Sequence, residues 1–223
     1  DAGNQSILFL NRRGFHQIFL CRSCGQALRC PNCDVSLTFH LNENRLACHY
    51  CGFKSPPNVS CKACGGSSLK PFGFGTEKME VELSTLYPDA RISRMDTDST
   101  RKKGAAGNIL KEFASEKTQI LVGTQMITKG YDFPKVTLVG VVAADLSLGF
   151  PDFRAGERTF QLLSQVAGRA GRGDQKGKVI VQTFNPDHYV IQAAVKHDFN
   201  LFFEKEKNLR SQLRYPPFPI WLA

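Results

Sequence analysis

The sequence has no run of apolar residues that approaches the roughly eighteen needed to span a membrane, so we expect a soluble protein. Its first residues also lack the basic, apolar and small-residue progression of a secretory signal. Because the chain opens at Asp1 just ahead of an apolar strand, we interpret it as a piece of a longer protein. No cysteine follows Cys64, which speaks against a secreted scaffold held together by disulfides.

The composition is that of an ordinary globular protein. Of the 223 residues, 42% are hydrophobic and 22% are charged, so a sizeable core is expected, and the length suits one medium domain with an insertion. The formal net charge is +9, and a cationic surface favours phosphate backbones. A modest excess of this size also occurs in proteins that touch no nucleic acid, so charge alone assigns no partner.

All eight cysteines lie in one short stretch, as four C-x-x-C pairs: Cys21/Cys24, Cys30/Cys33, Cys48/Cys51 and Cys61/Cys64. Two thiolates three residues apart on a tight turn can point at one ion, and two such knuckles complete a tetrahedral Zn²⁺ site. Four knuckles therefore predict two zinc sites. Disulfides are the alternative, but the neighbouring cysteines of a C-x-x-C pair are strained as mutual disulfides.

The spacing favours one pairing of the knuckles. Residues 34–47, between the second and third knuckles, are long enough for a β-hairpin, as in a zinc ribbon. The prediction is an inner site nested within an outer site: Cys30, Cys33, Cys48 and Cys51 inside, and Cys21, Cys24, Cys61 and Cys64 outside. Sequential pairing of the first four and last four cysteines stays open. Four protein ligands leave no position for water, so both sites are expected to be structural and to fold this segment.

The inner ribbon is predicted to carry an exposed hairpin tip. Segments 36–41 and 45–48 flank the polar residues 42–44. Phe39 and Tyr50 could stack on nucleic-acid bases, or they could fill a small core.

Outside the cysteine segment, strands and helices alternate, which predicts a RecA-like parallel sheet with helices on both faces. The expected strands are 7–10, 91–95, 120–122, 136–142 and 178–182, and the expected helices are 76–87, 101–114, 156–170, 187–195 and 199–213. We interpret residues 1–18 and 67–186 as this α/β domain, residues 19–66 as an inserted zinc module, and residues 187–223 as a helical extension with the start of a further domain.

Polar segments at the ends of these elements are candidate binding sites. Arg12 and Arg13 directly follow the opening strand, where they could contact phosphates or form a solvated loop. A later segment follows a strand and contains groups that could hold a phosphate, or accept a hydrogen bond from a hydroxyl or an arginine. Its candidate residues are Thr124, Gln125, Lys129, Gly130 and Asp132.

A third polar segment ends the helix expected at 156–170. Arg169 and Arg172 are three residues apart and therefore lie on one face, and paired guanidinium groups suit a triphosphate. Small residues around them let a ligand approach closely. The alternative is a basic helix end that interacts with its own dipole.

In this order, the three segments resemble motifs IV, V and VI of superfamily 2 helicases, and the pattern Q-x-x-G-R-x-G-R is highly specific for them. Over nearly the whole chain the sequence is still more similar to the PriA family, also called primosomal protein N′. The matching features, besides the four knuckles, are Asn11–Gly14, Gly75–Glu77, Gly123–Met126 and Gln165–Arg172.

The resemblance implies an ATP-driven 3′-to-5′ DNA helicase of the bacterial cytoplasm, associated with the nucleoid. Such a helicase recognises stalled or repaired replication forks and starts primosome assembly without an origin. The implied partners are forked DNA and its single-stranded/duplex junctions, other primosome proteins and single-stranded DNA-binding protein. The zinc module would take part in unwinding and in meeting these partners.

The resemblance also implies roles for single residues. Arg169 and Arg172 resemble arginine fingers that reach ATP on another lobe, and Gln165 resembles their hydrogen-bonding neighbour. Gly130 and Asp132 would contact the nucleotide as part of motif V. The residues implied to contact DNA are Arg12, Arg13, Thr124, Gln125 and Lys129.

One departure from the family pattern is that the chain has no G-x-x-x-x-G-K-[ST] loop and no D-E-x-[DH] run. ATP and Mg²⁺ would then be held mainly by a preceding lobe, so this chain alone is expected to be inactive and to bind DNA weakly. Two other hypotheses stay open: a zinc-ribbon DNA-binding or scaffold module, and a duplex translocase that does not separate strands.

Overall fold

The computed structural model describes residues 3–10, 18–40, 43–57, 59–72, 75–128, 133–168 and 177–218. The chain forms two compact units. The first, here called the sheet unit, comprises Asp1–Arg12, Phe74–Ala144 and Leu162–Gln182. The second, the cysteine unit, comprises Arg13–Gly73, Asp145–Gln161 and Thr183–Ala223. The domain boundaries expected from the sequence stay a prediction.

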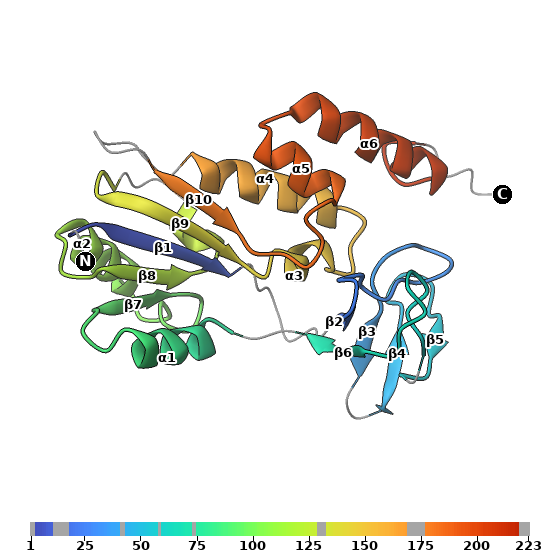
Figure 1. The fold of residues 1–223 in the computed structure, drawn as a ribbon, viewed down its shortest axis with the longest axis horizontal. Helices are drawn as coiled ribbons and strands as arrows, with labels where there is room; N and C mark the ends of the chain where they lie inside the picture. Colours follow the sequence, from blue (N-terminus) through green and yellow to red (C-terminus); the bar gives the residue numbers. More distant parts are fainter. Residues whose placement is uncertain are drawn as a thin grey trace. The chain divides into compact units, whose positions relative to one another are not determined.

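The sheet unit is built on five parallel strands in the order β10-β9-β1-β8-β7 (Figure 1). They span Gln5–Leu10 (β1), Ile92–Met95 (β7), Ile120–Gly123 (β8), Val136–Val142 (β9) and Lys178–Val181 (β10). The central strand β1 is apolar at adjacent positions, and Phe9 and Leu10 are both buried. Near-continuous apolar strands form where both faces of a parallel sheet are covered.

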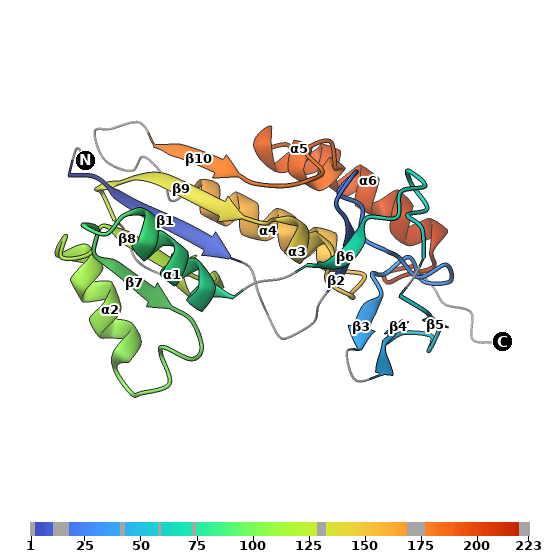
Figure 2. The same cartoon turned by 60° about the horizontal axis from the view of Figure 1, so that its bottom comes forward.

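Helices cover this sheet on both faces. Helix α1 (Thr76–Leu86) connects β1 outward to β7, whereas α2 (Ala105–Ala114) and α4 (Ala155–Ala167) lie on connections that run back toward β10. Because crossovers between parallel strands are right-handed, reversing the direction of travel moves the helix to the other face. Figures 1 and 2 show α1 and α2 on opposite sides of β7. The predicted fold class is confirmed.

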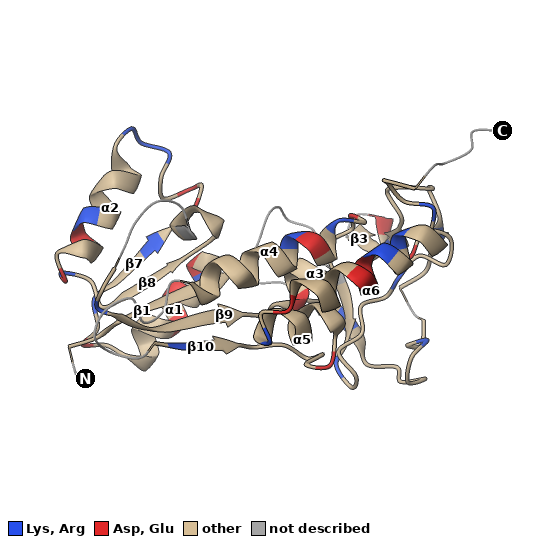
Figure 3. Ribbon diagram, turned by 90° about the horizontal axis from the view of Figure 1, so that it is seen from above, with Lys and Arg blue, Asp and Glu red and all other residues tan. Residues whose placement is uncertain are grey.

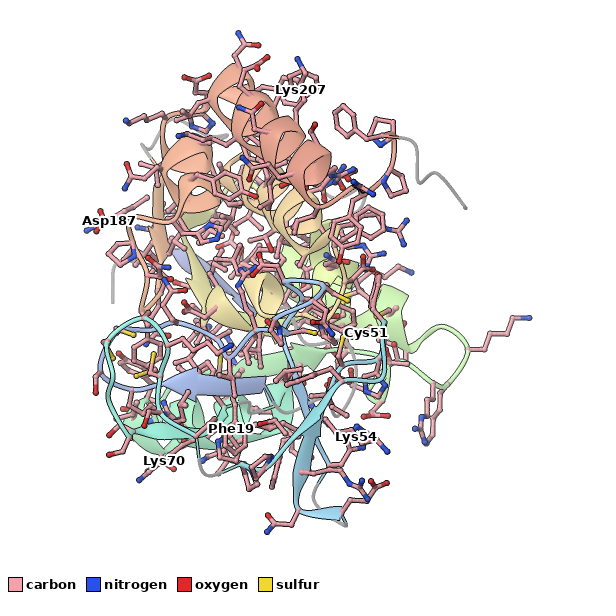
Figure 4. The ribbon with its side chains drawn as sticks, turned by 90° about the vertical axis from the view of Figure 1, so that its right-hand side faces the viewer. Phe19, Cys51, Lys54, Lys70, Asp187 and Lys207 are labelled. Carbon is pink, nitrogen blue, oxygen red and sulfur yellow. The ribbon has the colours of Figure 1, made fainter. Side chains whose placement is uncertain are left out.

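The cysteine unit contains a second sheet, which is antiparallel and has the order β5-β4-β3-β2-β6. Its strands are Ile18–Cys21 (β2), Thr38–His40 (β3), Arg45–Ala47 (β4), Lys54–Ser55 (β5) and Leu69–Phe72 (β6). Strands β3 and β4 form the hairpin that the sequence predicts. Phe19, which Figure 4 labels, belongs to a small apolar cluster with Leu28, Val35, Leu37 and Leu46, and Cys30 and Cys48 complete that cluster.

Helices from other parts of the chain complete the cysteine unit: α3 (Asp145–Leu148), the start of α4, α5 (Tyr189–Val195) and α6 (Phe199–Gln212). The start of α4 is held to α6 by a stacked pair, Phe160 on Phe202 with ring centroids 4.3 Å apart. Arg210 of α6 also reaches Glu157 of α4 at 2.7 Å. Figure 3 shows basic and acidic residues together on these two helices.

Several element boundaries differ by one or more residues from those expected, and two of the differences have a clear local cause. Helix α2 begins at Ala105 and not at residue 101, because its N-cap Gly104 has φ +86°, a left-handed conformation that a helix interior does not adopt. Strand β1 begins at Gln5, two residues early, because the Gln5 side-chain amide is buried and donates to two backbone carbonyls. Within the part of the chain that the structure describes, no helix has the length and apolar character of a membrane span.

The N-cap residue of α5, His188, predicts that the protein becomes less stable in acid. His188 Nδ1 accepts a hydrogen bond from the backbone N–H of Val190, which requires a neutral imidazole. Burial, and then the charge of Arg29, lower the pKa of His188 to about 4. Below an unfolded pKa of roughly 6.5, the unfolded state therefore binds more protons than the folded state. The stability that the neutral His188 cap contributes is therefore fully present above the unfolded pKa and is lost as the pH falls toward the folded pKa of about 4.

His188→Asn keeps an N-cap acceptor that does not titrate. Between pH 7 and pH 5, we expect the unfolding free energy of the unmodified chain to fall by about 2 kcal/mol more than that of the variant. Urea unfolding with saturating zinc measures this, and loss of zinc at low pH affects both proteins equally. Parallel pH profiles would show that the cap does not act as described.

Candidate metal centres

The four cysteine knuckles share one backbone conformation. In each, the residue after the second cysteine donates its N–H to the carbonyl of the first cysteine, at 2.8 to 3.0 Å. That residue has a positive φ of 52 to 74°, and it is Gly25, Asp34, Gly52 or Gly65. Glycine adopts this conformation without strain, which explains three of the four. At the fourth, Arg29 donates to both the backbone and the side chain of Asp34.

The eight sulfur atoms form two separate groups (Figure 4). The outer centre is made of Cys21, Cys24, Cys61 and Cys64, and the inner centre of Cys30, Cys33, Cys48 and Cys51. The structure therefore has the nested arrangement and not the sequential one. Within each group the sulfur atoms all lie within 4.8 Å of one another.

The spacing of the sulfur atoms fits zinc. Three Sγ–Sγ distances are 3.7 Å (Cys21–Cys64), 3.6 Å (Cys24–Cys61) and 3.6 Å (Cys30–Cys51). Four sulfurs at about 2.3 Å from a tetrahedral Zn²⁺ are about 3.8 Å from one another. The two tetrads therefore support two structural zinc ions. With four protein ligands each, they would stabilise the fold and leave no open position for catalysis.

Electrostatics also favour a cation in each tetrad. Burial and then the neighbouring thiols raise the pKa of Cys33 to about 12, whereas the backbone N–H of Phe53 lowers that of Cys51 to about 6. The thiols of one centre therefore do not all ionise at neutral pH without a positive charge among them. A divalent cation supplies that charge.

The aromatic residues of the hairpin have partners within the protein. Phe39 is half-buried and packs on Phe19, with ring centroids 4.8 Å apart, so it contributes to the apolar cluster. Tyr50 is 47% exposed, and its hydroxyl lies 3.5 Å from a carboxylate oxygen of Asp152.

The carboxyl edge of the parallel sheet, where the strands end, carries the described residues of the strand-end motifs. Thr124 directly follows β8 and is half-buried, and its N–H donates to the carbonyl of Met95 at 3.3 Å. Gln125 is half-buried in the short 3₁₀ helix Gln125–Thr128. Strands β1 and β8 are parallel neighbours and end together, so the chain leaves β1 toward Arg12 at this same edge. Arg12 and Arg13 lie outside the described residues.

The amino edge, where strands begin, carries the flanks of the other predicted segments. Helix α4 crosses from the end of β9 to the start of β10, so its last turn, just before Gly168, lies at this edge, as does Phe133 just before β9. Gln165 is exposed on this end of α4. The other residues predicted for these segments lie outside the described residues: Lys129, Gly130, Asp132, Arg169 and Arg172.

A buried polar network at the carboxyl edge was not predicted from the sequence. Thr76, the first residue of α1, donates to the Asp96 carboxylate at 2.5 Å, and Arg94 lies 3.3 Å from the same carboxylate. Burial alone would raise the pKa of Asp96, but the N–H of Ser99 and the Thr76 hydroxyl outweigh it, so the pKa is lowered. The Gly75–Glu77 motif was the available signal, because it contains Thr76.

Known protein families match parts of both the cysteine unit and the sheet unit. The family model described as the PriA DNA helicase Cys-rich region (CRR) domain matches residues 30–56, and the helicase conserved C-terminal domain matches residues 72–174. The replication restart protein PriA of Bacillus subtilis is 49% identical over 216 residues, covering 97% of this chain and 27% of that protein. The chain belongs to the PriA family.

A second relative is also a PriA protein. The PriA protein of Synechocystis is 49% identical over 218 residues, covering 96% of this chain and 26% of that protein. The chain thus spans about a quarter of the length of these relatives. Among solved structures, the C-terminal domain of the DEAD-box protein Dbp5 is 14% identical, with a TM-score of 0.42 over 93% of this chain and 82% of that one. A score this low adds nothing to the fold described above.

The nested arrangement can be tested by removing cysteines in pairs. Replacing Cys21 and Cys64 by alanine removes two ligands of one centre, so we expect one zinc per chain to remain. Replacing Cys21 and Cys30 damages both centres, so neither should retain zinc tightly. Elemental analysis of the purified, chelator-washed variants measures the zinc. Sequential pairing requires the opposite result, with no tightly bound zinc in the first variant and one zinc in the second.

Proposed function

We propose that this chain is the second motor lobe of an ATP-dependent 3′-to-5′ DNA helicase that acts in replication restart. The whole protein would recognise stalled or repaired forks and initiate primosome assembly without an origin. The observation that carries this proposal is the similarity to replication restart proteins over almost the entire chain. The whole protein would work in the bacterial cytoplasm, in association with the nucleoid.

The proposed nucleotide contacts come from two segments whose described flanks, Phe133 and the last turn of α4, lie at the amino edge. In the family pattern, Arg169 and Arg172 act as arginine fingers toward ATP, Gln165 orients them, and Gly130 and Asp132 contact the nucleotide. The chain path supports this grouping, because α4 leads toward the edge at which β9 begins. Planar guanidinium groups can bind developing phosphoryl charge with two donors at once. ATP and Mg²⁺ themselves would be held mainly by another lobe.

The proposed DNA contacts are Arg12, Arg13, Thr124, Gln125 and Lys129, of which the described residues Thr124 and Gln125 lie at the carboxyl edge. Hydroxyl, amide and guanidinium groups are the usual donors to phosphate oxygens, which position a strand without reading its sequence. The zinc module would aid unwinding and bind partner proteins, namely other primosome proteins and single-stranded DNA-binding protein. The chain alone is proposed to be inactive.

Replacing Arg169 by alanine in the full-length protein should lower DNA-stimulated ATP hydrolysis by about 10³-fold or more, by analogy with arginine fingers in GTPases. Zinc content and binding to forked DNA should be retained, because neither depends on transition-state charge. A matched control is Arg91→Ala, which removes an exposed arginine of the same unit and should leave the rate unchanged.

Two outcomes would contradict the helicase proposal. If Arg169→Ala leaves ATP hydrolysis intact, the chain functions as a zinc-ribbon DNA-binding or scaffold module. If the unmodified protein hydrolyses ATP on forked DNA without releasing a strand, it is a duplex translocase. A strand-displacement assay on the same forks, run alongside the ATPase assay, separates these outcomes.

A further inference from the structure

The end of α6 forms a cap that fixes the following residue, Tyr215. Arg214 adopts a left-handed conformation with φ +53°, and its N–H donates to the carbonyl of Ser211. The N–H of Tyr215 then donates to the carbonyl of Arg210 at 2.8 Å. This pair of bonds is a Schellman cap, which ends a helix and sets the direction of the next residue. The Tyr215 side chain is therefore aimed by α6 itself.

Tyr215 contacts both knuckles of the inner centre. Its hydroxyl donates to the backbone carbonyl of Cys33 at 2.5 Å, across a sequence separation of 182 residues. Its ring meets Tyr50 edge-on, with centroids 6.3 Å apart, and Tyr50 lies between the ligands Cys48 and Cys51. The backbone N–H of Tyr50 in turn donates to Cys48 Sγ at 3.4 Å. One side chain thus holds a ligand residue of the first knuckle and the turn of the second.

The other face of Tyr215 is also fixed. Its ring stacks on Phe153, with centroids 4.9 Å apart and planes 16° from parallel. The guanidinium of Arg210 lies 5.3 Å from the centroid of the same phenylalanine ring, and it bonds Glu206 and Glu157. Because these contacts restrain the ring, the hydroxyl stays at the Cys33 carbonyl with little further loss of side-chain entropy.

We propose that Tyr215 is a positioning residue of the inner metal centre, which makes the retention of zinc there depend on α6. The hydroxyl fixes the peptide of Cys33 and, with the ring on Tyr50, holds the two knuckles at the spacing that zinc requires. Groups just outside a metal's own ligands orient those ligands, and losing one typically weakens metal binding by about 10- to 100-fold. None of the Tyr215 contacts described here reaches the outer centre, so the outer centre should not respond.

The test is the rate at which each centre of the zinc-loaded chain releases its ion to an excess of a chromogenic chelator. The phase that disappears in Cys51→Ala belongs to the inner centre, and the phase that disappears in Cys64→Ala belongs to the outer centre. Tyr215→Phe removes the hydroxyl and keeps the ring. We expect it to accelerate the inner phase by about tenfold or more and to leave the outer phase unchanged.

Tyr189→Phe is the matched control, because it also removes a tyrosine hydroxyl with a short hydrogen bond, which here goes to Glu206 at 2.6 Å and not to a metal-ligand residue. It should change neither phase. The proposal is overturned if Tyr215→Phe leaves the inner phase unchanged, since the ring would then only fill space. It is equally overturned if both phases accelerate together, since that indicates a general loss of stability.

Discussion

Thiolates held 3.6 to 3.7 Å apart repel one another strongly, and the cysteine unit brings four of them together twice. A divalent cation at each centre removes that repulsion, and the free energy of structural zinc binding, about 10–16 kcal/mol, is comparable with the stability of a whole domain. The first cysteine of every knuckle is buried, and Cys30 and Cys48 form part of the apolar cluster. Metal binding and core formation in this unit are therefore expected to occur together.

Helix α4 is divided between the two units, with residues 155–161 in the cysteine unit and residues 162–167 in the sheet unit. Its start is held beside α6 by Glu157 and Phe160, and Phe153 just before it stacks on Tyr215. Its end carries Gln165 and leads directly into the segment of the proposed arginine fingers.

Local rules made much of this structure predictable. The C-x-x-C spacing specified each knuckle, and the alternation of apolar strands with amphipathic helices specified the parallel sheet. Contacts between distant parts of the chain were not predictable, because no local pattern links Tyr215 to Cys33 or Thr76 to Asp96. The sequence also did not indicate that the last turn of α4 would lie at the amino edge, since that depends on the strand order. The start of α2 was misjudged because the conformation of Gly104 is not evident from its neighbours.

We conclude that two closed tetrathiolate zinc centres organise the cysteine unit. X-ray absorption at the zinc edge, combined with elemental analysis of the purified chain, tests this claim most directly. We expect two zinc ions per chain, with an average coordination of four sulfur atoms at about 2.3 Å and no nitrogen or oxygen ligand. A single zinc per chain, or a shell that includes nitrogen or oxygen, would contradict it.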